Sequence, residues 1–177
     1  MISVILVNYQ SADQLLSAVT SVFNQQLPDQ LEVIVVNNSQ SVSENAILQA
    51  QLPQEITYIR NNENAGFAKA CNQAFARSRG EFIFLLNPDA RLLPSALSRL
   101  AESLKKNPNA GAIGPRAYWD NECQFLMPPS TFPSITSFYK QAISRLHPKL
   151  SLYQSLDFRE KALQTWTCTT PIPVEAL

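Results

Sequence analysis

The sequence has few glycines and cysteines, and neither sign of charge is in excess. Its 177 residues include four glycines, and its formal net charge is +0. We therefore expect no general attraction to nucleic acid or to an anionic surface. Cys71, Cys123 and Cys168 lie far apart with no C-x-x-C pair, which argues against a disulfide framework and a cysteine zinc site. Their odd number is typical of reduced thiols in a cytosol.

Long hydrophobic runs are also missing. The apolar runs are far shorter than the ~18 residues that a membrane span needs. Met1 leads directly into the strand-like Ile2–Val7, with no basic segment before it, so we expect no signal peptide and a cytoplasmic location. No G-x-G-x-x-G follows this first run, and no P-loop is present. These absences exclude a dinucleotide-binding Rossmann domain and a P-loop nucleoside triphosphatase.

Four short apolar runs alternate with segments of helical length. Hydrophobic residues make up 45% of the chain and charged residues 16%, a composition that excludes a disordered chain. Apolar runs of this length are typical of strands that are covered on both faces. The expected strands are Ile2–Val7, Leu31–Val36, Ile56–Ile59 and Glu81–Leu86, and the expected helices include Ala12–Phe23, Ala65–Arg77 and Pro94–Leu104. The alternation predicts an α/β fold with a mainly parallel sheet.

The pattern changes after Pro108. In chain order we expect the end of a fifth strand at Gly111–Pro115, a hairpin over Arg116–Met127, a connector over Pro128–Pro133, an amphipathic helix over Ser134–His147 and an edge strand over Thr165–Val174. The amphipathic helix has Lys140 and Arg145 beside its apolar stripe. Two roles stay open for it, packing against the sheet or peripheral contact with a membrane surface.

Each of the four strand-like runs ends in a polar segment that carries asparagine. These segments are Asn8-Tyr9, Asn37-Asn38, Arg60–Asn64 and Asn87–Asp89. Any one of them alone would be an ordinary turn. The carboxyl ends of parallel strands meet at one edge of the sheet, where ligands bind in such folds. Together, therefore, the four segments predict a ligand site at that edge.

Asp89 is the sharpest chemical feature of this predicted site. It follows an apolar strand within Asn87-Pro88-Asp89. A lone carboxylate there can hold Mg²⁺ or Mn²⁺ when diphosphate oxygens supply the other ligands. The alternative is a helix cap or an Asx turn that leads into the next helix. No glycine loop is available for phosphates, which favours the metal.

Four blocks of the sequence are distinctive, namely Val4–Tyr9, Leu31–Asn38, Ile59–Asn72 and Phe84–Arg91, of which the last two are long and specific. Together they resemble family-2 glycosyltransferases with the GT-A fold. The rhamnosyltransferase-like branch, which builds bacterial surface polysaccharides of the cell envelope, is the most similar. The resemblance implies a three-layer α/β/α domain over residues 1–177 with an incomplete C-terminal part. Residues 1–115 would form the nucleotide-sugar-binding part, and residues 116–177 would begin the acceptor part.

The resemblance also implies the residues of the site. Those expected to bind the nucleotide-sugar are Asn8, Tyr9, Asn37, Asn38, Gly66, Phe67, Asn72, Asn87 and Asp89. Tyr9 would line the base pocket, Asn37 would replace an aspartate that accepts the pyrimidine N3–H, and Asp89 would be the metal ligand of the D-x-D motif. Three departures weaken the charge of the site. Asn37 can still accept the hydrogen bond from the base but adds no charge. Cys71 replaces a common arginine, and Asn87 replaces the first carboxylate.

The activity implied is inverting transfer of a hexose, with rhamnose as the first guess. The donor would be a dTDP- or UDP-sugar, and the acceptor a growing glycan or a lipid-linked sugar at the inner membrane face.

The general base of the family is expected beyond Leu177, and Glu175 is not expected to replace it. A nucleotide-sugar-binding module without turnover is the alternative. A nucleotidyltransferase is disfavoured, because Ser11–Gln14 is not rich in glycine and arginine. Apolar surface that helices of the family's later segment would cover is expected to be exposed here and to favour self-association.

Overall fold

The computed structural model describes residues 1–25, 27, 31–120 and 122–127. The chain falls into two compact units, Met1–Ile113 and Gly114–Leu177, and each is described by itself. The predicted connector over Pro128–Pro133, the helix over Ser134–His147 and the strand over Thr165–Val174 lie outside the described residues. In the part of the chain that is described, no helix has the length and apolar character that crossing a membrane requires.

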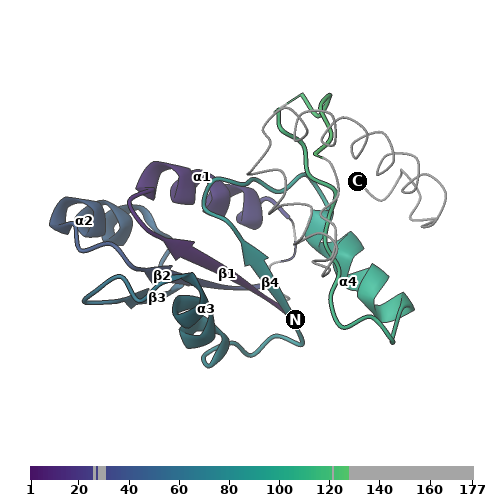
Figure 1. Cartoon of the computed structure of the whole chain (residues 1–177), viewed down its shortest axis with the longest axis horizontal. Coiled ribbons are helices and arrows are strands. Elements are labelled where there is room, and N and C mark those ends of the chain that lie inside the picture. The colour runs from purple at the N-terminus through teal and green to yellow at the C-terminus, as the bar shows by residue number, and fades with distance from the viewer. Residues whose placement is uncertain (26, 28–30, 121, 128–177) are drawn as a thin grey trace, which may run out of the picture. The chain divides into compact units, whose positions relative to one another are not determined.

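The first unit alternates strands and helices, as the sequence predicts (Figure 1). In chain order the elements are β1 (Ile2–Asn8), α1 (Ala12–Phe23), β2 (Leu31–Asn37), α2 (Val42–Gln51), β3 (Thr57–Arg60), α3 (Phe67–Phe75), β4 (Phe82–Leu86) and α4 (Ala96–Lys106). The predicted α/β class is therefore confirmed, and the bounds of α1 agree with the prediction at both ends.

The four strands form one parallel sheet in the order β3-β2-β1-β4. Of the two inner strands, β1 is paired with β2 and β4, and all of its residues are buried. In the register of the sheet, Asn8 lies opposite Asn37, and Asn37 lies opposite Arg60. The register thus brings the polar ends of three strands into line at the carboxyl edge of the sheet.

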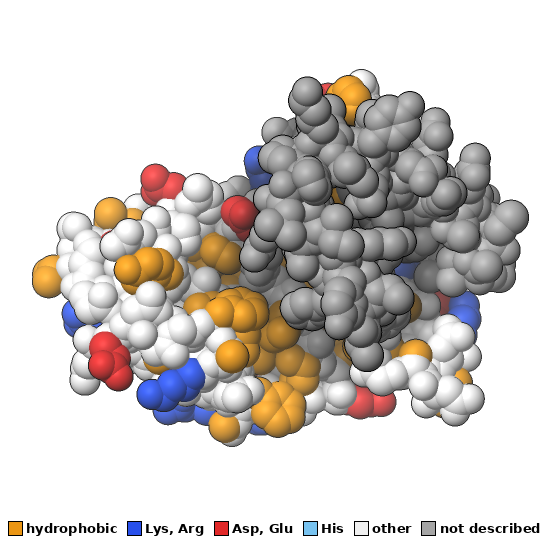
Figure 2. Space-filling model, in the orientation of Figure 1, with side chains coloured by type: hydrophobic (Ala, Val, Ile, Leu, Met, Phe, Trp, Pro, Cys, Tyr) orange, Lys and Arg blue, Asp and Glu red, His pale blue; other side chains and the backbone are white. Residues whose placement is uncertain are grey.

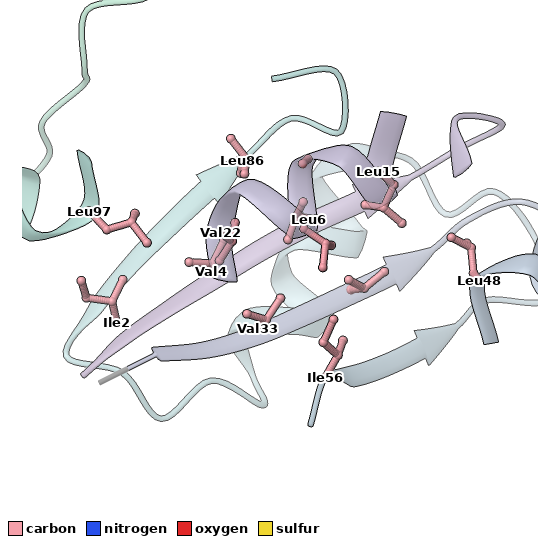
Figure 3. Close-up of a cluster of buried hydrophobic side chains, with 13 residues drawn as sticks. Ile2, Val4, Leu6, Leu15, Val22, Val33, Leu48, Ile56, Leu86 and Leu97 are labelled. Atoms are coloured by element: carbon pink, nitrogen blue, oxygen red, sulfur yellow. The ribbon is translucent and has the colours of Figure 1, made fainter. Parts of the chain in front are cut away.

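Alternating side chains of the strands build two apolar layers. On one face, Val4 and Leu6 of β1 pack with residues of α1 and α2, as the close-up in Figure 3 shows. On the other face, Ile5 and Val7 pack with α3. The residues of α3 in this layer include the fully buried Ala70 and Ala74. Full burial of each large aliphatic side chain stabilises the fold by about 1.5–3 kcal/mol, so the core fixes the register of the sheet.

The face that carries α3 also exposes large hydrophobic side chains. Figure 2 shows hydrophobic atoms gathered on this side of the molecule. Phe67 and Phe75 of α3 are 55% and 61% exposed, and Leu85 of β4 is 53% exposed. Exposed apolar surface of this kind favours association, so self-association stays a prediction.

Three predictions made from the sequence need correction here. Helix α3 spans Phe67–Phe75 and not the predicted Ala65–Arg77. The predicted strand end at Gly111–Pro115 is not part of a strand, because residues 107–115 have no strand pairing in the described chain. Pro94 does not open the helix that follows it. Helix α4 begins at Ala96, after Ser95 has adopted a left-handed φ of 62°.

The hairpin predicted over Arg116–Met127 is confirmed in the described part of the second unit. Tyr118 and Leu126 form an antiparallel bridge, and the amide of Trp119 donates to the carbonyl of Phe125 at 2.9 Å. The carboxylate of Asp120 accepts from the amides of Gln124 and Phe125. These backbone hydrogen bonds, that from Gln124 first, lower the pKa of Asp120 below its ordinary value.

A buried carboxylate joins β1, β2 and the segment before β4. Glu32 accepts hydrogen bonds from the hydroxyl of Ser3 and from both the backbone amide and Nε of Arg79. Burial raises the pKa of Glu32, but the hydrogen bonds from Ser3 and Arg79 outweigh it and hold that pKa below its usual range. The amide of Gly80 donates to the Ser3 hydroxyl at 2.8 Å and closes the cluster.

The close approach at Gly80 generates a stability prediction. A Cβ atom at this position would lie 2.5 Å from the backbone nitrogen of Ser3 and 3.0 Å from the carbonyl carbon of Ile2. Because β1 is paired on both sides and cannot shift cheaply, Gly80→Ala should lower the free energy of unfolding by about 1–3 kcal/mol. Urea denaturation measures this loss. Gly111→Ala is the control, since a Cβ there meets nothing within 4 Å, and equal stability of the two variants would contradict the prediction.

Candidate functional site

The residues that the sequence predicts for the site divide into a buried floor and an exposed rim. Asn8 and Asn37 are fully buried, and Asn38 is 1% exposed; these three residues form the floor. Tyr9 is 47% exposed, and the other members of the rim are also exposed, namely Gly66, Phe67, Asn72, Asn87 and Asp89. The rim side chains are therefore open to contact from outside, whereas the floor side chains are enclosed by the protein.

The Asn8 amide is the centre of the floor. Its Nδ2 donates to Asn37 Oδ1 at 2.9 Å and to Glu44 Oε1 at 3.1 Å. Asn37 Oδ1 also accepts from the amide of Ser39 at 2.9 Å, and Asn37 Nδ2 donates to the hydroxyl of Tyr58 at 2.8 Å. An amide oxygen has two lone pairs, so Asn37 Oδ1 has reached its usual capacity.

The sequence predicts that the Asn37 side chain meets the edge of a pyrimidine base, a role that stays a prediction. Here the side chain faces the protein interior, and its oxygen already has two partners. The reason is the parallel register, which sets Asn37 beside Asn8 on the neighbouring strand. Asn37 is thus a residue of the floor in this structure.

Asn38 links the end of β2 to the loop before α3. Its Nδ2 donates to the carbonyl of Gly66 at 3.3 Å, and its Oδ1 accepts from Asn61 at 2.7 Å. Asn61 also donates to Gln73 of α3 at 2.8 Å. Gly66 has a φ of 78° at the start of this helix, a conformation that glycine adopts most easily. The floor therefore sets the position of the Gly66 loop.

Sequence reasoning missed Glu44, Asn45 and Tyr58 as members of the floor. The hydroxyl of Tyr58 donates to Asn45 at 2.9 Å, and burial raises the pKa of Tyr58, so it stays a neutral donor. The spacing Ser41-x-x-Glu44 is the signature of a capping box, which would have located the start of α2. It would not have revealed that the Glu44 side chain leaves its own helix to contact Asn8.

The rim carries the groups that can meet a charged ligand. Asp89 is exposed in the turn after β4, where the amide of Ala90 donates to the carbonyl of Asn87 at 3.1 Å. Among the described residues, no group of three or more His, Cys, Asp or Glu side chains could hold a metal ion. A single exposed carboxylate fits a divalent cation only when the ligand itself supplies further oxygens. This donor set suits a cation bound together with a diphosphate.

A shallow cleft lies beside the Gly66 loop. Its volume is about 320 Å³, and it is lined by Asn61, Asn62, Glu63, Ala65, Lys69 and Gln73. Lys69 brings a cation to the start of α3, two residues before Cys71. Burial raises the pKa of the Cys71 thiol, so this side chain is a neutral group. Lys69, which sequence reasoning also missed, is exposed and lines this cleft, whereas Cys71 packs against the apolar layer under α3.

The sequence matches the model of a family described as glycosyl transferase family 2 over residues 3–173. It is 23% identical to an uncharacterised glycosyltransferase of Methanocaldococcus jannaschii, over 93% of this chain and 61% of that protein. It is 25% identical to the poly-beta-1,6-N-acetyl-D-glucosamine synthase of Staphylococcus epidermidis, over 63% of this chain and 27% of the synthase. The chain thus spans less than two thirds of the length of these relatives.

Solved structures share the fold. A mannosyltransferase from Pyrobaculum calidifontis, in complex with GDP-Man and Mn²⁺, has a TM-score of 0.54 at 24% identity over 58% of this chain and 32% of its own. TarS of S. aureus in complex with UDP has a TM-score of 0.50 at 22% identity over 60% of this chain and 32% of its own. These similarities confirm the GT-A fold that the sequence predicts.

The shared amide of Asn8 generates a prediction for Asn37. The substitution Asn37→Asp would place a second carboxylate against the amide that already binds Glu44. Repulsion between the two charges should lower the free energy of unfolding by about 1–3 kcal/mol at pH 7. The loss should shrink as the pH falls toward ~5, because protonation of one carboxylate relieves the repulsion.

Urea denaturation at the two pH values measures this effect. The control is Asn64→Asp, since Asn64 is exposed and uses its Oδ1 to accept from the amide of Gly66 at 3.0 Å. A carboxylate can make that same bond, so this variant should keep the stability of the wild type. A loss at Asn37→Asp that does not depend on pH would show that charge repulsion is not its cause.

Proposed function

Because the chain belongs to glycosyl transferase family 2, we propose that it binds a nucleoside-diphosphate sugar at the carboxyl edge of its sheet and takes part in transfer of the sugar. The observation that carries this proposal is the arrangement of the site. A buried amide floor spans β1 and β2, and an exposed carboxylate follows β4 at the same edge. Ligands in parallel α/β sheets bind at this edge.

The residues of the rim have separate roles in this proposal. Tyr9 offers an aromatic wall to the base, and Gly66, Phe67 and Asn72 border the nucleotide. Asn87 and Asp89 face the diphosphate, and Asp89 is the metal ligand. A bound Mg²⁺ or Mn²⁺ would neutralise charge on the diphosphate as it leaves. Lys69 adds a positive charge to the cleft beside the Gly66 loop.

The donor and acceptor are proposed from the sequence resemblance. The donor is a dTDP- or UDP-hexose, with rhamnose first, and the acceptor is a glycan or a lipid-linked sugar at the cytoplasmic face of the inner membrane, with inversion at the anomeric carbon. Of the solved relatives, one holds GDP-Man and another holds UDP. This fold therefore accepts both purine and pyrimidine nucleotides, and the base preference needs a direct test.

The metal role of Asp89 predicts nucleotide binding that depends on a divalent cation. In calorimetry with Mn²⁺, Asp89→Asn should weaken binding of UDP and dTDP at least ~10-fold, because the amide cannot replace the charge that holds the cation. Without a metal, the variant and the wild type should bind equally weakly. Glu55→Gln is the matched control, since Glu55 is an exposed acid in the segment before β3. Unchanged binding by Asp89→Asn in the presence of Mn²⁺ would remove the metal role.

The base pocket predicts a preference for pyrimidine nucleotides. Binding of dTDP and UDP should exceed that of ADP and GDP when each is titrated with Mn²⁺. Tyr9→Ala should cost about 1–3 kcal/mol of binding free energy, the usual range for loss of base stacking. Phe75→Ala is the control, because Phe75 is an exposed aromatic residue at the far end of α3. Equal or stronger purine binding would contradict the pyrimidine donor and leave the metal test unaffected.

A further inference from the structure

The turn that carries Tyr9 is short and conformationally unusual. It spans residues 9–11, between the end of β1 at Asn8 and the start of α1 at Ala12. Gln10 has a φ of 55°, a value that residues other than glycine rarely adopt without support. The Ser11 side chain does not cap α1. Its hydroxyl donates back to Asn8 Oδ1 at 3.0 Å instead. The turn therefore depends on contacts from elsewhere in the chain.

Glu44 of α2 supplies those contacts. Its Oε1 accepts from Asn8 Nδ2 at 3.1 Å and from the backbone amide of Ala12 at 3.0 Å. These donors stand on the two sides of the turn, so one carboxylate oxygen bridges both of its ends. The Ala12 amide lies in the first turn of α1, where no intrahelical acceptor exists, and a carboxylate is a strong acceptor at such a position.

We propose that Glu44 is a positioning residue for nucleotide binding, which acts by holding the turn that presents Tyr9. The inference rests on the proposed function, in which Tyr9 forms the wall of the base pocket. Glu44 is 9% exposed and lies in the floor, so it acts through the turn. Because Glu44 belongs to α2, a shift of α2 would also move the turn that presents Tyr9.

Only one of the two carboxylate oxygens carries these contacts. Glu44 Oε2 is buried and has no hydrogen-bond partner among the described residues. Glutamine can therefore present the same acceptor at Oε1 after the charge has been removed. Methionine has a similar length but offers no comparable acceptor. Glu44→Gln and Glu44→Met thus form a pair of neutral variants that differ mainly in the bridging oxygen.

The first measurement follows the Ala12 amide by hydrogen exchange in the full chain. The wild type and Glu44→Gln should protect this amide, and Glu44→Met should exchange it at least ~10-fold faster, because its acceptor is lost. Equal exchange in all three proteins would overturn the proposal. This readout needs no nucleotide. If the wild type bound none, the proposed function would fail while the bridge itself would still be tested.

The second measurement is the affinity for UDP and dTDP with Mn²⁺. Glu44→Met should bind at least ~10-fold more weakly than the wild type, and Glu44→Gln should stay within ~3-fold, because misplacement of a binding group is costly. In a Tyr9→Ala background Glu44→Met should cause little further loss of affinity, since both substitutions remove the contact of Tyr9 with the base. Additive losses, or equal weakening by Gln and Met, would overturn the proposal.

A milder variant covers the case in which Glu44→Met does not fold. Ser11→Ala removes only the bond from the Ser11 hydroxyl to Asn8 and leaves the bridge in place. Because that bond supports the same turn, Ser11→Ala should weaken nucleotide binding by ~2–5-fold, and the loss should vanish in the Tyr9→Ala background. Unchanged binding by Ser11→Ala would count against a role for the turn. Glu55→Gln serves again as the control for loss of an acid.

Discussion

The carboxyl edge of the sheet depends on one shared hydrogen-bond donor, the amide of Asn8. Both of its N–H bonds are used, one by Asn37 on the neighbouring strand and one by Glu44 on α2. A buried amide without partners would cost about 1–3 kcal/mol, so these contacts are obligatory. They join β1, β2 and α2 at a single point, from which the Tyr9 turn and the loop after β2 extend. The positions of these two segments follow from this junction.

The same junction explains why position 37 carries an amide in this chain. Asn37 accepts from Asn8 and Ser39 and donates to Tyr58, whereas a carboxylate has no hydrogen to donate at neutral pH. Glu44 already brings one negative charge to the Asn8 amide, and a second would be buried against it. The charge of the floor is therefore carried by Glu44, and the neutral Asn37 completes the network. Asp89 on the rim and Lys69 beside the neighbouring cleft are exposed charged side chains.

Particular elements show how far the sequence could predict the fold. Both ends of helix α1 were predicted to the residue, because helical apolar spacing starts after Ser11 and continues to Phe23. Helix α3 starts later than predicted, because the positive φ of Gly66 delays its start to Phe67 and apolar periodicity does not reveal such a turn. The strand expected to end at Gly111–Pro115 failed for a related reason. A short apolar run becomes a strand only when a partner strand is in register beside it.

By itself the sequence determined the alternation of strands and helices, the parallel sheet and the clustering of polar residues at one edge, because these follow from local periodicity and strand-end chemistry. It could not determine which of those polar residues are buried and which are exposed. Asn8, Asn37 and Asn38 look as available in the sequence as Asn87 does, yet they are buried and Asn87 is exposed. That division, and the contact of Glu44 with the Tyr9 turn, depend on register and on helix packing between residues far apart in the chain. Only the tertiary structure fixes these, because hydrogen-bond partners more than 25 residues apart leave no periodic trace in a single sequence.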